Sequence, residues 1–411
     1  MYAYTAELDA WRESRAELID KTPPAPPAGG SDRARYPRPW IAAALVVVLA
    51  AAAGAFWLIP RPVATTHTPN PEAIRLLRQA NFSGNAGAIQ IQTAIRDIQE
   101  AIRIDPAYPP GWAALATGHV AQTWFGELPA TQTMSAAKRA AGQALRLDPS
   151  NSAAHRVLGW VAHYQDWDHM TAERHFREAI DLDASSAVAH SWFGDFLVDL
   201  RRFDEARVHY RKANDLNPRW LEPMTFAANT FTFTGSPDLA VGEQRRVLEL
   251  EPNFGLGIHF LGRSYLAQGD YPRAIEQLQK SNEVLGRVPF SVGDLGYALA
   301  LGGRRDEAEQ LLTDLAAKRG TGYYPAFPIA QIHLGLGATE LALDWLDRAA
   351  DERHLGFFLP SADPVYDSIR SHPRFEALIR RINLAGSAPA RPGAHPDRSS
   401  SQTEKTGPAR R

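Results

Sequence analysis

The chain has 411 residues, and 45% of them are hydrophobic, so it can bury a core of ordinary size. Its formal net charge of −2 provides no overall basic field of the kind that attracts nucleic acid. The sequence contains no cysteine, which excludes disulfides, iron–sulfur clusters, thiolate zinc sites and cysteine nucleophiles.

A short segment, residues 1–38, comes first. Tyr2-Ala3-Tyr4 can form a strand, and Thr5 can cap a helix that runs to about Ile19. The proline and glycine of residues 21–38 are typical of a linker. The strand and helix resemble the closing portion of an excisionase-like winged DNA-binding domain, but the recognition helix is absent. Two interpretations of this cytoplasmic segment stay open: an unstructured tail, or a remnant that could not bind nucleic acid alone.

Residues 39–60 are predicted to form a transmembrane helix. The run WIAAALVVVLAAAAGAFWLI, residues 40–59, is uncharged and spans roughly 30 Å as a helix, the thickness of the bilayer hydrocarbon. Three arginines precede the run and one follows it, so the positive-inside rule predicts a cytoplasmic N-terminus and an extracytoplasmic remainder. These residues are Arg33, Arg35, Arg38 and Arg61. A cleaved signal peptide and a buried core helix are the alternatives to a single-pass anchor in the lipid bilayer.

After a linker, residues 61–71, small residues recur every 34 positions. One column consists of Ala172, Ala206, Ala240, Ala274, Ala308 and Ala342. A second consists of Gly194, Ala228, Gly262, Gly296 and Ala330, and a third of Arg201 (a departure), Gly235, Gly269, Gly303 and Gly337. A unit of two antiparallel helices explains them, because small residues allow close crossings and glycine ends the first helix in a left-handed conformation.

The repeat resembles a known family. HSWFGDFLVDLRRFDEARVHYRKANDLNP, residues 190–218, resembles a tetratricopeptide repeat, and so does HFLGRSYLAQGDYPRAIEQLQKS, residues 259–281. About eight units are expected within 72–356, at 72–108, 109–151, 152–186, 187–220, 221–254, 255–288, 289–322 and 323–356. The resemblance implies an all-α fold, a right-handed superhelical solenoid in which stacked units bury a continuous core.

The C-terminal part carries a narrower resemblance. FFLPSADPVYDSIRSHPRFEALIRRINL, residues 357–384, is expected to form a capping helix, and residues 385–411 are expected to be disordered. Together with GWVAHYQDWDHMTAERHFREAIDLD, the cap is similar to bacterial proteins that join tetratricopeptide repeats to an N-terminal signalling module. This resemblance implies the bacterial inner membrane as the location and a regulatory output as one possible role.

No motif of a known catalytic or phosphate-binding chemistry occurs in the sequence. We therefore expect no enzymatic activity, no catalytic residues, no cofactor and no metal site. Four histidines lie close in sequence, but without the i, i+4 spacing of a helical metal site they are interpreted as structural or surface residues: His155, His163, His169 and His175. The acids near them are expected to cap and solvate a turn before a helix: Asp166, Asp168 and Glu173.

The first helix of each unit in such a solenoid lines the concave face. One predicted groove column consists of Trp160, Asp195, Asn229, Arg263, Tyr297 and Gln331. From a second column and its surroundings we include Arg156, His259 and Tyr164. Aromatic side chains supply contact area and amide or guanidinium groups bind peptide backbones or carboxylates, so this mixture favours a protein or peptide partner.

The sequence therefore predicts a membrane-anchored protein-interaction module that acts as a scaffold or assembly factor. The alternative is the sensor part of a membrane-bound transcriptional regulator whose DNA-binding domain is truncated. If the groove is the binding surface, replacing Asn229 and Arg263 by alanine is expected to weaken partner binding without unfolding the solenoid.

Overall fold

The computed structural model describes residues 67–80, 88–125, 128–354 and 362–384. Among these residues, no helix is both long enough and apolar enough to cross a bilayer. The transmembrane helix predicted at 39–60 lies outside the described residues, as do the segment 1–38 and the tail 385–411. Their expected structures therefore stay predictions.

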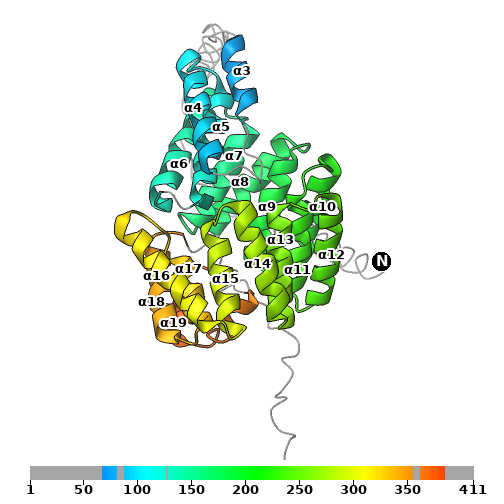
Figure 1. Cartoon of the computed structure of the whole chain (residues 1–411). Coiled ribbons are helices and arrows are strands. Elements are labelled where there is room, and N and C mark those ends of the chain that lie inside the picture. Colours follow the sequence, from blue (N-terminus) through cyan, green and yellow to red (C-terminus); the bar gives the residue numbers. More distant parts are fainter. Residues whose placement is uncertain (1–66, 81–87, 126–127, 355–361, 385–411) are drawn as a thin grey trace, which may run out of the picture. The chain divides into compact units, whose positions relative to one another are not determined.

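The described residues form helices and no strands, which confirms the all-α class (Figure 1). One antiparallel pair falls within each of the eight predicted units. The pairs are α3 (Pro71–Gln79) with α4 (Ala88–Ile104), α5 (Pro109–Phe125) with α6 (Ala130–Leu147), α7 (Ser152–Tyr164) with α8 (His169–Leu182), α9 (Ala187–Asp199) with α10 (Phe203–Leu216), α11 (Glu222–Phe233) with α12 (Pro237–Leu250), α13 (Gly255–Gln268) with α14 (Tyr271–Leu285), α15 (Pro289–Leu301) with α16 (Arg305–Thr321), and α17 (Phe327–Gly335) with α18 (Thr339–Asp351).

Local sequence signals set the ends of these helices. Asn151 caps α7 and Ser186 caps α9, each accepting a hydrogen bond from a backbone N–H in the first turn. The turn between the helices of a pair is left-handed at the predicted glycines, with φ between 74° and 79°. Arg201 and Trp167 occupy the same turn in earlier pairs and are left-handed as well, with φ of 59° and 56°. The third column of the sequence therefore marks a left-handed turn in these pairs as well, although its residue there is not glycine.

The two columns of small residues lie at the crossings between helices. All six alanines of the first column are completely buried. A Cβ built on Gly194 would lie 2.6 Å from the Tyr210 ring, and one on Gly296 would lie 2.4 Å from Ile332. Side chains larger than those present would force the helices apart.

Consecutive helices pack against each other along the whole described chain, from α3 to α19 (Figure 1). In addition, the first helix of each pair contacts the first helix of the next pair, from α3 through α17. The first helices therefore form one continuous layer, and the side chains that they direct away from their partners share a single surface.

The C-terminal segment differs from the single capping helix predicted for 357–384. Its described part contains a 3₁₀ turn, Pro364–Tyr366, and a short helix, α19 (Pro373–Arg381), while residues 357–361 lie outside the described residues. The prolines explain the interruption, because a residue before proline is disfavoured in the α conformation and proline is favoured at a helix start. Tyr366, Phe375 and Ile382 pack on the last helix pair.

This segment also returns to the third helix pair. The Ile382 carbonyl lies 3.1 Å from His169 Nε2, and Asn383 Nδ2 donates to the Trp167 carbonyl at 3.3 Å. Ala362 is buried in the hydrophobic cluster that contains Trp160 and Phe196. The segment thus covers part of the layer of first helices.

Candidate functional site

The predicted groove residues all lie on first helices, but most of their surface is buried. Seven are at most 9% exposed: Arg156, Trp160, Tyr164, Asn229, His259, Arg263 and Gln331. Asp195 and Tyr297 are partly buried. These residues therefore present little surface to solvent, and their role in partner binding stays a prediction.

Six of the nine residues meet around one cavity of about 100 Å³: Trp160, Tyr164, Asp195, Asn229, His259 and Arg263. Arg156, Tyr297 and Gln331 do not line it. Six first helices contribute to the lining, from α5 to α15, because each directs the same face inward. Asp363 from the C-terminal segment completes the wall.

Aromatic rings form much of the wall. Trp124 stacks on Trp160 with 6.3 Å between ring centroids, and Tyr164 lies 4.6 Å from Trp160. Phe290 meets Trp124 edge-on at 6.4 Å. Phe226 and Phe260 line the same space.

Sequence reasoning missed most of these aromatic residues, although a signal was present. Trp192, Phe226 and Phe260 follow one another at 34-residue spacing, directly beside the predicted groove columns. Trp124 belongs to a unit whose inserted residues obscure the register.

Two carboxyl groups that line the cavity, those of Asp195 and Asp199, are held by hydroxyl and imidazole groups. The Tyr210 hydroxyl donates to Asp195 at 2.8 Å. Burial, reinforced by the charge of nearby Asp199, raises the pKa of Asp195 to about 8. Asp199 accepts a hydrogen bond from the Tyr164 hydroxyl at 2.7 Å and lies 2.8 Å from His163 Nε2. The sequence analysis did not select Asp199.

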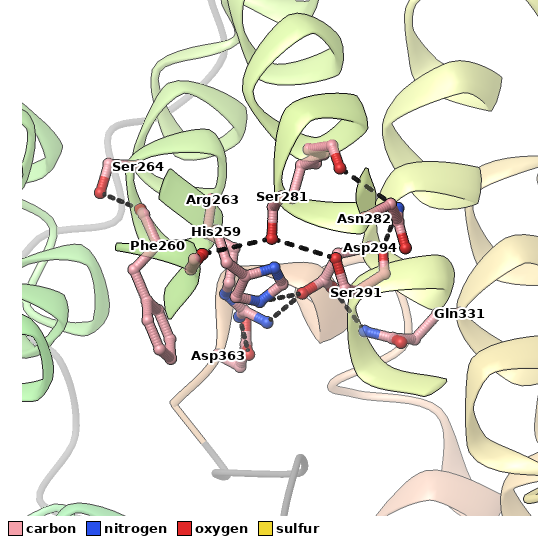
Figure 2. Close-up of polar contacts among 12 residues, drawn as sticks. His259, Phe260, Arg263, Ser264, Ser281, Asn282, Ser291, Asp294, Gln331 and Asp363 are labelled. Carbon is pink, nitrogen blue, oxygen red and sulfur yellow. Dashed lines mark hydrogen bonds and ion pairs between the residues drawn. The ribbon is translucent and has the colours of Figure 1, made fainter. Parts of the chain in front are cut away.

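In a second network, Arg263 bridges two buried carboxylates (Figure 2). Its guanidinium donates to Asp294 at 2.9 Å and also to Asp363, a residue 100 positions later in the chain. Gln331 donates to the other oxygen of Asp294 at 2.7 Å. Burial alone would raise the pKa of Asp294, but the charge of Arg263 outweighs it and holds the pKa below its usual value.

This network changes the expectation for Arg263. The sequence suggested a free groove side chain that could be removed without unfolding the protein. In the structure Arg263 is the positive partner of both Asp294 and Asp363, which are at most 2% exposed, so its removal would leave two buried carboxyl groups without a positive partner. Arg263 therefore has a structural role.

Several buried polar atoms that belong to cavity-lining residues have no hydrogen-bond partner. Among them are the acceptors Asn229 Oδ1 and His259 Nδ1 and the donor Arg263 Nε. Burial lowers the pKa of His259, so its imidazole is neutral at pH 7. Because unpartnered buried polar groups cost free energy, such atoms indicate a place for a bound group or for water.

The histidines of the third pair contact one another, and one of its acids caps a helix. The Nδ1 atoms of His155 and His175 lie 3.0 Å apart, and those of His163 and His169 lie 2.8 Å apart. Asp168 caps α8 by accepting from the Thr171 N–H at 3.0 Å. Within the ranges that the structure describes, no three His, Asp or Glu side chains are arranged to hold a metal ion.

Comparison with known proteins identifies one of the repeats. A family model of the tetratricopeptide repeat matches residues 187–219, which contain α9 and α10. The fourth helix pair is therefore similar to a tetratricopeptide repeat. The resemblance implied by the spacing is thereby confirmed at this unit, and the same pairing of helices extends through the described chain.

A curated relative is also a tetratricopeptide protein. Small glutamine-rich tetratricopeptide repeat-containing protein 2 of Mycosarcoma maydis is 29% identical over 106 residues, which are 25% of this chain. The match spans 30% of that relative's length.

Three solved structures are similar at low identity. Pseudomonas aeruginosa pilF is 20% identical with a TM-score of 0.39, and the match covers 51% of this chain and 91% of that chain. PilW, titled a widely conserved type IV pilus biogenesis factor, is 20% identical with a TM-score of 0.40, and the match covers 51% of this chain and 92% of that chain. Yeast Tom70 is 18% identical with a TM-score of 0.46, and the match covers 79% of this chain and 70% of that chain. We infer no function from them.

Proposed function

We propose that this chain binds a protein or peptide partner through the layer formed by its first helices. The observation that carries the proposal is the cavity, where six of these helices surround a space with aromatic walls and unpartnered buried polar atoms. Aromatic anchors around a small number of placed polar groups are typical of protein and peptide recognition. No described residue gives a reason to prefer an enzymatic role.

We propose in addition that residues 40–59 anchor the chain in a membrane, so that the repeats act as a tethered scaffold or assembly factor. The support for the anchor is the uncharged twenty-residue run, long enough to span the bilayer hydrocarbon.

Site-specific photo-crosslinking in the cells that make the protein tests both proposals. Benzoylphenylalanine replaces Phe260, which is partly buried at the cavity, in one full-length variant. In the control it replaces Leu239, which is 56% exposed on the second helix α12.

We expect protein adducts of discrete mass from position 260 and few from position 239, with the adducts in the membrane fraction. Equal adducts from both positions, or none from position 260, would contradict binding at the layer of first helices. Adducts that remain in the soluble fraction would contradict the anchor.

A further inference from the structure

The unused polar atoms of the cavity are mainly hydrogen-bond acceptors. Asn229 Oδ1 is buried and has no donor. His259 Nε2 lies 3.2 Å from the Asp294 carboxylate, so this nitrogen carries the proton and the unpartnered Nδ1 is an acceptor. Asp195 and Asp199 add carboxyl oxygens to the same lining. A group that enters the cavity is therefore expected to bring hydrogen-bond donors.

The charged residues that line the cavity also favour a ligand that is a cation. Three carboxyl residues line the cavity, Asp195, Asp199 and Asp363, against one arginine, Arg263. Although Arg263 Nε has no partner, the guanidinium charge is already balanced by Asp294 and Asp363. A cation beside Asp195 and Asp199 would be attracted by the charge of Asp199, and it would favour the ionised form of Asp195, whose pKa burial raises to about 8.

The aromatic wall and the size of the cavity limit the kind of cation. Faces of Trp, Tyr and Phe attract ammonium and guanidinium groups at ring distances within about 6 Å. A cavity of about 150 Å³ accommodates benzene. The volume of about 100 Å³ in this protein therefore suits a head group rather than a whole folded element.

We propose that this cavity is a binding site for one basic group, a guanidinium or primary ammonium, contributed by an arginine or lysine side chain of the protein partner. Asp195 and Asp199 compensate its charge, Asn229 Oδ1 and His259 Nδ1 accept its N–H groups, and the Trp124–Trp160 stack faces its apolar stem. The identity of the partner's side chain depends on the proposed function, whereas the affinity for the basic group can be measured without a partner.

Matched charged and neutral probes test the site in the full-length protein. Propylguanidinium is compared with propylurea, which has nearly the same shape without the charge. The peptide acetyl-Ala-Ala-Arg-Ala-Ala-amide is compared with its citrulline counterpart in the same way. Binding is measured by calorimetry and by saturation-transfer NMR.

We expect saturable binding of propylguanidinium at least tenfold tighter than that of propylurea, and tighter binding of the arginine peptide than of propylguanidinium. Equal binding of charged and neutral probes would overturn the proposal. Binding of free propylguanidinium with exclusion of the peptide would overturn the assignment to a partner side chain and indicate a small amine as the ligand.

Two variants connect the binding to the named residues. Asp195→Asn removes the ability to ionise beside a bound cation but retains an oxygen that can accept from Tyr210, and Asn229→Leu removes the unpartnered acceptor. Both are expected to weaken propylguanidinium binding at least tenfold. Glu249→Gln, an equal charge change at an exposed position of α12, is the control and should leave binding unchanged.

Unchanged affinity in Asp195→Asn, with a melting temperature like that of the native chain, would contradict the site. If crosslinking at position 260 succeeds while the probes fail, the proposed function stands and the basic-group site is wrong. If the probes bind but no protein is crosslinked, the cavity site stands and the proposed function is wrong.

Discussion

At the scale of single residues, burial decides what a groove side chain can do. Arg263 and Asn229 occupy equivalent positions in adjacent repeats, and the sequence treats them alike. In the structure Arg263 holds two buried carboxylates, whereas Asn229 Oδ1 has no partner. The two side chains should therefore respond differently to removal.

We predict that Arg263→Met lowers the free energy of unfolding by about 3–5 kcal/mol at pH 7, because it leaves Asp294 and Asp363 buried and unpaired. Asn229→Leu should change it by no more than about 1 kcal/mol, because an unpartnered polar group is replaced by an apolar one of similar shape. Urea unfolding of the full chain measures both. Similar losses in the two variants would contradict the difference in their roles.

The sequence could select the right helix face for these residues but not their exposure. The 34-residue register placed six of the nine predicted residues around one cavity, because periodicity determines which face of a helix points inward. Asp363, which closes the wall, lies 100 positions after Arg263 in a segment without the repeat. No spacing rule could relate the two residues.

At the scale of elements, the turn within each helix pair carries a conformational requirement. Gly269 ends α13 with φ of 77°, and no other atom lies within 4 Å of a Cβ built there. Gly242 is equally open but lies inside helix α12, outside the left-handed region. The two glycines therefore separate the effect of backbone conformation from that of space.

We predict that Gly269→Ala lowers the free energy of unfolding by about 1 kcal/mol, because an L-residue in the left-handed conformation is strained. Gly242→Ala should raise it by about 0.5–1 kcal/mol, because alanine is the better helix former. Thermal and urea unfolding of the two variants test this. A stabilised Gly269→Ala would contradict a left-handed requirement at the turn.

For the C-terminal segment, the sequence predicted a cap on the last repeat but not the contact with the third helix pair. The expectation for residues 357–384 is a capping helix, and Tyr366 and Phe375 do pack on the last helix pair. The return of this segment to Trp167 and His169 depends on how far successive repeats rotate, which no single repeat specifies.

At the scale of the whole molecule, buried histidines link stability to pH. Burial lowers the pKa of His169, His175, His209 and His354 to about 4. For the first three, a neighbouring histidine contributes to this lowering. In the unfolded chain these groups titrate near their ordinary pKa of about 6.5. Between pH 6.5 and 4 the unfolded chain therefore binds more protons than the folded protein, so acidification favours unfolding.

Two carboxyl groups act in the opposite direction. Burial raises the pKa of Asp195, to about 8, and also that of Asp363, so the folded protein binds more protons than the unfolded chain at these two positions. Their contribution to stability increases as the pH falls. Four histidines outnumber two carboxyls, and the net effect of acidification below pH 6.5 should be a loss of stability.

We therefore predict that the melting temperature of the full chain falls as the pH decreases from 6.5 to 4.5. The double variant His175→Asn, His209→Asn should flatten this dependence, because asparagine can hydrogen-bond to the Nδ1 atoms of His155 and His190 but does not titrate. Thermal unfolding followed by circular dichroism at pH 7.5 and 4.5 gives the comparison, with the pH 7.5 value as the control for packing changes. An equal decrease in the native chain and the variant would show that these two histidine pairs do not carry the acid sensitivity.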